Sequence, residues 1–222
     1  TFPKKKIKIN NSNIFFKDNL GEIISIIKID KTNLFFDNKR LYNVLNLKGE
    51  AFNVPFVFNF NNSPNSSRYE KINFKSKKIR LNISNESSMK KKLILGENNI
   101  SFLTATVNTK YSVREKLITF KSSKSRLSNS QVSYDGKLSI NPFDLNFNID
   151  LDNHKVSKLV NINPILIEFI KSGMLFNNNI SVKNSITIKS NDKNEFFQNA
   201  KINFNIVNGK LNFDNSVFVN NK

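Results

Sequence analysis

The stretch that decides the fold is Ala200–Val219, AKINFNIVNGKLNFDNSVFV, in which two alternating runs flank Asn208-Gly209. Both central residues of a type I′ turn need a positive φ, which Asn and Gly tolerate best. With this dipeptide as the loop, Val207 pairs with Lys210. A shift of one residue would turn the whole apolar set into water, so the alternation fixes the register. We therefore predict a β-hairpin with one apolar face and one face of Lys and Asn.

The apolar residues of this hairpin and of an earlier strand are the candidate site residues. In the hairpin, Ile206 is expected opposite Leu211 and Phe204 opposite Phe213. The earlier strand has five apolar residues at every second position, with Asp144, Asn146 and Asn148 between them. Period two is typical of strands with one buried or concave face. The expected lining consists of Phe143, Leu145, Phe147, Ile149, Leu151, Ile202, Phe204, Ile206, Leu211 and Phe213.

Short alternating runs separated by turn residues continue through most of the first 150 residues. Asp135-Gly136 resembles a second hairpin turn, and Gly49-Glu50 is expected to be a turn before the run Val54–Phe60. The fold class predicted for residues 1–222 is therefore mainly β. We expect a single β-rich region containing one long curled antiparallel sheet.

One segment, residues 156–176, departs from the two-residue period. Its apolar residues are spaced as on a helix, and Asn163-Pro164 is a helix-start signal. Gly173 is a plausible end. We predict one short helical insertion near 156–176, followed by terminal strands within 179–219.

The chain carries a formal net charge of +18 and is rich in Lys and Asn. The basic residues are spread over nearly every strand, whereas a nucleic-acid footprint is usually clustered. Aromatic residues alternate away from the lysines, which disfavours a platform for stacking bases. We therefore interpret the charge as a solvated outer face and expect no nucleic-acid partner.

Catalytic constellations are scarce. His154 is the only histidine, and there is no cysteine. Asp150, Asp152 and His154 stand at alternate positions and could offer metal ligands, but they also belong to the polar half of a strand. No phosphate-binding loop or dinucleotide-binding motif is present. The sequence predicts a protein that is not an enzyme and has no cofactor or metal.

So many one-sided strands need something to cover their apolar faces. The single helical segment is too small for this. Two arrangements follow. Either the sheet folds onto itself as a sandwich, or it curls into an apolar groove that meets a lipid.

Several segments resemble the AsmA-like family, whose members are relatives of TamB and of the bridge-like lipid-transfer proteins. The resemblance rests on Ile7–Asp18, IKINNSNIFFKD, and on Leu45–Phe60, LNLKGEAFNVPFVFNF. It continues in Ile162–Lys189, INPILIEFIKSGMLFNNNISVKNSITIK, and in the strands of the hairpin that follow.

The resemblance implies a non-enzymatic role in the envelope of a Gram-negative bacterium. It implies a sheet curled into an apolar groove that conducts phospholipid or another acyl lipid between inner and outer membrane, or assists outer-membrane assembly. The family location is periplasmic, with an inner-membrane anchor. Because this chain starts at Thr1, we expect it to be part of a longer protein with the anchor outside it. The alternative is a structural or adhesive β-sandwich interaction module.

Overall fold

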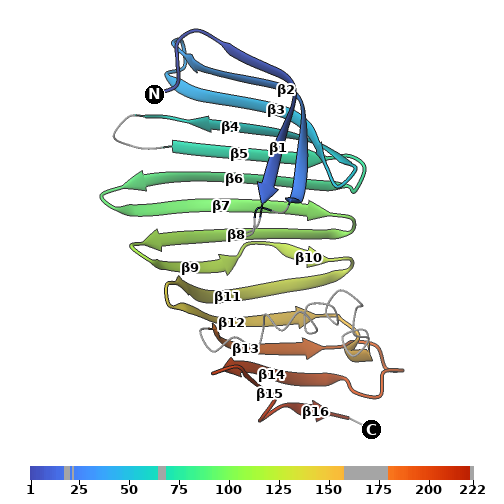
Figure 1. The fold of residues 1–222 in the computed structure, drawn as a ribbon. Helices are drawn as coiled ribbons and strands as arrows, with labels where there is room; N and C mark the ends of the chain where they lie inside the picture. Colours follow the sequence, from blue (N-terminus) through green and yellow to red (C-terminus); the bar gives the residue numbers. More distant parts are fainter. Residues whose placement is uncertain (18–20, 22, 65–68, 158–179, 221–222) are drawn as a thin grey trace. The chain divides into compact units, whose positions relative to one another are not determined.

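The computed structural model describes residues 1–17, 21, 23–64, 69–157 and 180–220. These residues form sixteen strands of one large sheet, so the expected mainly β fold is confirmed (Figure 1). The apolar groove stays a prediction. Contacts divide the chain into two compact units, Thr1–Thr106 and Val107–Lys222, here called the N-terminal and C-terminal units.

The N-terminal unit is an antiparallel meander in which each strand pairs with the next along the chain. Short connections join strands whose polar and apolar residues alternate, as neighbouring antiparallel strands require. Its strands are β1 (Ile7–Lys17), β2 (Ile23–Asp37), β3 (Tyr42–Ala51), β4 (Val54–Asn62), β5 (Tyr69–Ser76), β6 (Leu81–Lys90) and β7 (Leu93–Phe102).

Strands β1 and β2 turn sharply near their middle (Figure 1). The pairing register skips Asn11 on β1, which has a φ of 49°, and Asp30 on β2. Gly49 of β3 lies so close to β2 beside this bend that a Cβ on it would clash with the backbone oxygen of Lys28. The turn expected at Gly49-Glu50 is therefore wrong. Gly49 lies inside β3, where the absence of a side chain lets the backbone of β2 come close.

The β3–β4 turn instead uses Phe52 and Asn53, with φ of 49° and 60°. Ala51 pairs with Val54 across this two-residue loop. Positive φ at both central positions matches the twist of the flanking strands. Nothing in the residue type of Phe52 indicates such a turn, so the sequence pattern placed it three residues too early.

The C-terminal unit begins with strand β8, which starts at the end of the N-terminal unit. Strand β11 pairs with β10 near its start and with β9 near its end. The strands are β8 (Ala105–Arg114), β9 (Leu117–Ser122), β10 (Ser125–Leu127), β11 (Ser130–Ile140), β12 (Phe143–Asp152), β13 (Ile180–Lys189), β14 (Asn199–Val207), β15 (Lys210–Asn212) and β16 (Val217–Val219).

The predicted hairpin at Asn208-Gly209 is confirmed. The two residues have φ of 51° and 68°, and Val207 pairs with Lys210. The turn expected at Asp135-Gly136 is wrong, because β11 runs through it without interruption. A Cβ on Gly136 would lie 2.6 Å from Cζ of Phe120 and 2.7 Å from Cβ of Phe147. The absence of a side chain on Gly136 leaves room for the side chains of Phe120 and Phe147, and the chain does not reverse its direction there.

One pair of neighbouring strands departs from the expected antiparallel arrangement. Strands β12 and β13 are parallel, from Phe143 opposite Ile180 to Asp152 opposite Lys189. Parallel neighbours need a crossover connection. The predicted helical insertion at 156–176 lies in that connection, and apart from Val156 and Ser157, which have helical backbone, it falls outside the described residues.

Few hydrophobic side chains of the described residues are buried, and all of them except Ile29 lie in the C-terminal unit. Leu151, Val156, Ile188 and Ala200 form one buried cluster, against which Phe197 packs. Val156 follows β12, and its cluster includes one residue from each of β12, β13 and β14. One end of this unit's apolar face is therefore covered.

Candidate functional site

The register of the C-terminal unit collects the predicted lining residues on one face of the sheet. Strand β12 pairs with β11 and β13 without a register shift, so its five alternating apolar residues face the same way. Leu145 lies in a row with Val182 and Ile206, and Ile149 lies in a row with Ile186 and Ile202. Leu211 continues the first row across the hairpin.

Exposure varies along this face. Ile206 and Leu151 are buried, whereas Phe143 is 37% and Phe213 is 52% exposed. Phe213 lies just beyond β15, and its ring centroid is 5.5 Å from that of Phe204. The two rings are therefore in contact, although the pairing of β14 with β15 ends at Asn205 and Asn212 and does not include Phe204 opposite Phe213. The remaining members, Leu145, Phe147, Ile149, Ile202, Phe204 and Leu211, are half-buried.

A second apolar face, which sequence reasoning did not assign to the site, occupies the N-terminal unit. Residues paired across β2 to β7 form apolar rows because each strand has the same two-residue period. The signal was available in the alternation of Val54–Phe60, which the sequence shows plainly. Its central members are Leu34, Leu45, Leu47, Phe56, Phe58, Phe60, Ile72, Phe74, Ile83 and Ile100.

Among residues 1–17, 21, 23, 26–64 and 69–106, this N-terminal face has no second layer of apolar side chains. Phe58 and Phe74 lie opposite one another on central strands, yet each is only half-buried. Ile29 is the only aliphatic or aromatic side chain in that part of the chain that is buried. In a two-layer sandwich the central residues of the inner face would be fully enclosed.

Charge is segregated to the opposite face. Lys48, Lys71 and Lys75 belong to the set of alternate residues that point away from the apolar rows. Glu70 is the exception. It lies at the margin of the apolar face, where Asn62 Nδ2 donates to its Oε1 at 3.1 Å. The sheet thus has one apolar and one strongly basic face.

The expectation that aromatic residues avoid the basic face is wrong in β2, β3 and β5. The register places Phe35, Tyr42 and Tyr69 on the polar face. The amino group of Lys6 lies 5.5 Å from the centroid of the Phe35 ring, as in a cation–π contact. The single-sequence pattern misses this because these aromatics end their strands, where alternation gives way to turn residues.

The only histidine forms a structural contact. The hydroxyl of Ser130 donates to the carbonyl oxygen of Asn153 at 2.8 Å and lies 2.9 Å from Nδ1 of His154. The carbonyl oxygen of Asn153 and Nδ1 of His154 thus both lie within hydrogen-bond distance of this one hydroxyl. Ser130 is also buried. Among the described residues no group of three acidic or histidine side chains is arranged to hold a metal. Asp150, Asp152 and His154 therefore do not form such a group.

The described residues contain no helix long and apolar enough to span a membrane. No known protein family, curated protein or solved structure matches this chain.

Proposed function

We propose that this chain binds the acyl chains of lipids along the apolar face of its sheet and acts without catalysis. Its ligand is phospholipid or another acyl lipid. The observation that carries this proposal is the N-terminal face, where rows of Leu, Ile and Phe cross neighbouring strands without a covering layer in the described residues. A contiguous apolar face whose side chains stay half-buried on central strands is the kind of surface that marks an interaction site.

The physical reason is the free energy of apolar burial. Moving apolar surface out of water releases roughly 25 cal/mol per Å². Flexible acyl chains can follow rows of side chains that repeat at the strand spacing of about 4.8 Å. Because the charged residues lie on the other face, an acyl chain meets no desolvation penalty from Lys or Glu on the central rows.

The resemblance to the AsmA-like family extends this proposal to the cell envelope. On that basis the chain is part of a periplasmic lipid conduit between inner and outer membrane, or of an outer-membrane assembly factor. The one-sided sheet supports the lipid contact, and the resemblance alone supports the location.

The test is a pair of variants on neighbouring residues of β4. Phe58→Asp places a carboxylate on the apolar face, and Val57→Asp places the same group on the basic face, where Val57 is already exposed. We expect both variants to keep the wild-type β-sheet circular dichroism spectrum. Binding of a fluorescent phosphatidylethanolamine should fall at least about tenfold in Phe58→Asp, equivalent to roughly 1.4 kcal/mol, and stay unchanged in Val57→Asp.

The structural or adhesive β-sandwich is the rival proposal. The small buried cluster around Ile188 favours it, because a covering layer is present there. A sandwich predicts that Phe58→Asp unfolds the N-terminal unit, since burying an unpaired charge costs several kcal/mol. Loss of the melting transition in Phe58→Asp, with no lipid bound by the wild type, would refute the lipid proposal.

A further inference from the structure

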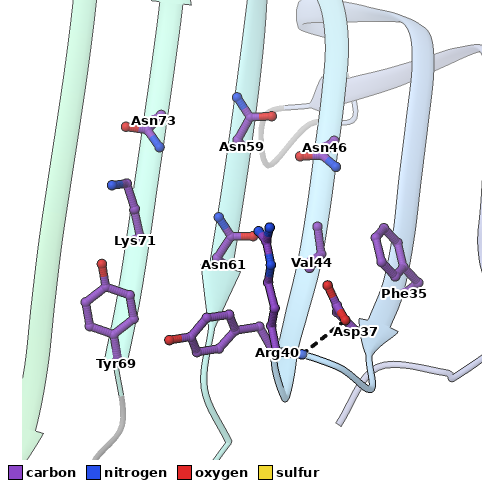
Figure 2. Close-up of a pocket in the computed structure, with 11 residues that line it drawn as sticks. Phe35, Asp37, Arg40, Val44, Asn46, Asn59, Asn61, Tyr69, Lys71 and Asn73 are labelled. Atoms are coloured by element: carbon purple, nitrogen blue, oxygen red, sulfur yellow. Dashed lines mark hydrogen bonds between the residues drawn. The ribbon is translucent and has the colours of Figure 1, made fainter.

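The basic face of the N-terminal unit contains a hollow that the proposed lipid contact does not use. It has a volume of about 640 Å³ and lies over strands β2 to β5 (Figure 2). We call it the amide hollow. Its lining consists of Phe35, Asp37, Arg40, Tyr42, Val44, Asn46, Asn59, Asn61, Tyr69, Lys71 and Asn73.

The strand register builds a row of side-chain amides across the hollow. Asn46 pairs with Asn59, and Asn59 pairs with Asn73, so the three amides point from the same face of neighbouring strands (Figure 2). Asn61 adds a fourth amide one step along β4. Adjacent strands lie about 4.8 Å apart, so the amides repeat at roughly the length of one sugar ring.

Two tyrosines stand at one end of the hollow. The ring centroids of Tyr42 and Tyr69 are 6.1 Å apart, and their planes are inclined by 34°. Neither residue is fully buried. An aromatic face offers apolar contact to a flat ligand, while the phenol hydroxyl both donates and accepts hydrogen bonds.

Few charged side chains line the amide hollow, although the chain as a whole carries +18. The two lining cations are Arg40 and Lys71, and the lining anion is Asp37. Lys71 is paired with Glu86 of β6. With Glu86 these are two positive and two negative side chains, and Lys6 on the ring of Phe35 adds one positive charge beside the hollow. A site for phosphate would instead concentrate cations, and a site for a divalent metal would concentrate carboxylates.

Amides, phenols and few unpaired charges suit a ligand with many hydroxyl groups. Each Asn side chain offers an acceptor oxygen and two donor hydrogens, which matches hydroxyls that also donate and accept. We infer that the amide hollow binds a neutral oligosaccharide, with its hydroxyls on the Asn row and one ring face on the tyrosines. This ligand uses the face opposite the lipid, so the inference goes beyond the proposed function.

The main rival occupant is single-stranded nucleic acid, because bases also stack on aromatic rings beside cations. Its phosphates would need several cations in the hollow, whereas Lys71 is paired with Glu86, and the other lining cation, Arg40, shares the lining with Asp37. The observations therefore favour the neutral ligand.

The experiment is a titration of the ¹⁵N-labelled chain with three neutral probes, maltohexaose, cellohexaose and chitopentaose, and separately with oligothymidylate. We expect at least one saccharide to bind with a Kd between about 10 μM and 1 mM. The shifted signals should include the side-chain amides of Asn46, Asn59 and Asn73. Lipid binding should be unaffected by saturating saccharide.

Two variants and a control complete the test. Tyr69→Phe keeps the ring and removes the hydroxyl, and Asn59→Ala removes the central amide. Each should weaken saccharide binding by about threefold to tenfold. Asn146→Ala, on an exposed polar position of β12 in the other unit, should leave it unchanged.

The inference is overturned if no saccharide of the panel binds at about 10 mM. It also fails if the shifted signals lie elsewhere, or if oligothymidylate alone binds and does so with strong salt dependence. The wild-type signal map decides the matter even if a variant does not fold. Failure here would leave the lipid proposal standing, because that proposal rests on the opposite face.

Discussion

The sheet needs a glycine at position 136 and at position 209 for different physical reasons. Gly209 has a φ of 68° in a two-residue loop, where a side chain would be strained. Gly136 lies inside β11, where the ring of Phe120 and the backbone of β12 occupy the position of a Cβ. The sequence shows the glycine in both places but not which constraint applies.

Replacing Gly136 by Ala should destabilise the C-terminal unit by about 1–3 kcal/mol, because its Cβ would lie 2.6 Å from the backbone oxygen of Asn146. Urea denaturation followed by circular dichroism measures the change. Lys137→Ala, at the neighbouring exposed position, is the control and should change stability by less than about 0.5 kcal/mol. Equal stability of both variants would show that β11 and β12 can separate at this point without cost.

The Lys71–Glu86 pair gives a pH prediction at the same scale. Hydrogen bonding from the Lys71 ammonium lowers the pKa of Glu86, and the same bond raises the pKa of Lys71. The stabilisation by Glu86 is therefore present above the pKa of the unfolded carboxyl and is lost as the pH falls through the lower folded pKa. The stabilisation by Lys71 is present below the pKa of the unfolded ammonium and is lost as the pH rises through the raised folded pKa.

Because both side chains are more than a third exposed, solvent screening keeps this pair below about 1 kcal/mol. Glu86→Gln should therefore lower the free energy of unfolding at pH 7 by less than that amount. The difference from wild type should vanish at a pH below the folded pKa of Glu86. A difference that persists there would mean that Glu86 acts through packing and not through its charge.

At the scale of elements, turn chemistry explains both the successes and the failures of prediction. Asn208-Gly209 was predictable because both residues favour positive φ and alternating runs flank them. The β6–β7 hairpin uses Lys91 and Lys92, with φ of 46° and 65°, which no residue preference indicates. The parallel pairing of β12 and β13 was also unpredictable, since the alternation of Phe143–Asp152 is the same in either direction.

The Lys91-Lys92 turn yields a stabilising prediction. Replacing the pair by Asn-Gly, as Lys91→Asn with Lys92→Gly, should raise the free energy of unfolding by about 1 kcal/mol, because those residues adopt positive φ at lower cost. Thermal melting of the double variant measures the gain. Lys92→Ala is the control for removing the charge alone. A lower melting temperature in the double variant than in the control would contradict the type of turn described here.

The candidate site also has a part that the sequence predicts and the amide hollow, which it does not. The apolar rows could be predicted, because period two and strand pairing together determine which residues share a face. The amide hollow could not. Asn residues are so common in this chain that no single one stands out, and only the register of β3, β4 and β5 brings Asn46, Asn59 and Asn73 into a row.

For the whole molecule, the separation of an apolar face from a basic face sets the expected partners. The basic face should attract DNA or RNA weakly and without sequence preference. We expect gel-shift binding that disappears as salt rises through physiological strength, because counterion release is its only source. Tight binding that resists salt and selects a sequence would contradict the view of this face as a solvated surface.

The central claim is that, among the described residues, the apolar faces of the two units are open to an acyl chain except where their side chains are buried, as in the cluster around Ile188. It predicts opposite behaviour for two Asp substitutions in the C-terminal unit. Ile188 is 0% exposed, so Ile188→Asp should cost several kcal/mol and unfold that unit. Phe204→Asp, on a half-buried residue of the predicted lining, should fold and lose lipid.

Native mass spectrometry of the purified chain, with Phe204→Asp beside the wild type, tests this claim most directly. After expression in a Gram-negative bacterium, the wild-type spectrum should contain peaks heavier than the bare chain by the mass of phospholipid. In folded Phe204→Asp those peaks should be strongly reduced. A wild-type spectrum with only the bare chain, together with a variant that has lost its melting transition, would contradict the account.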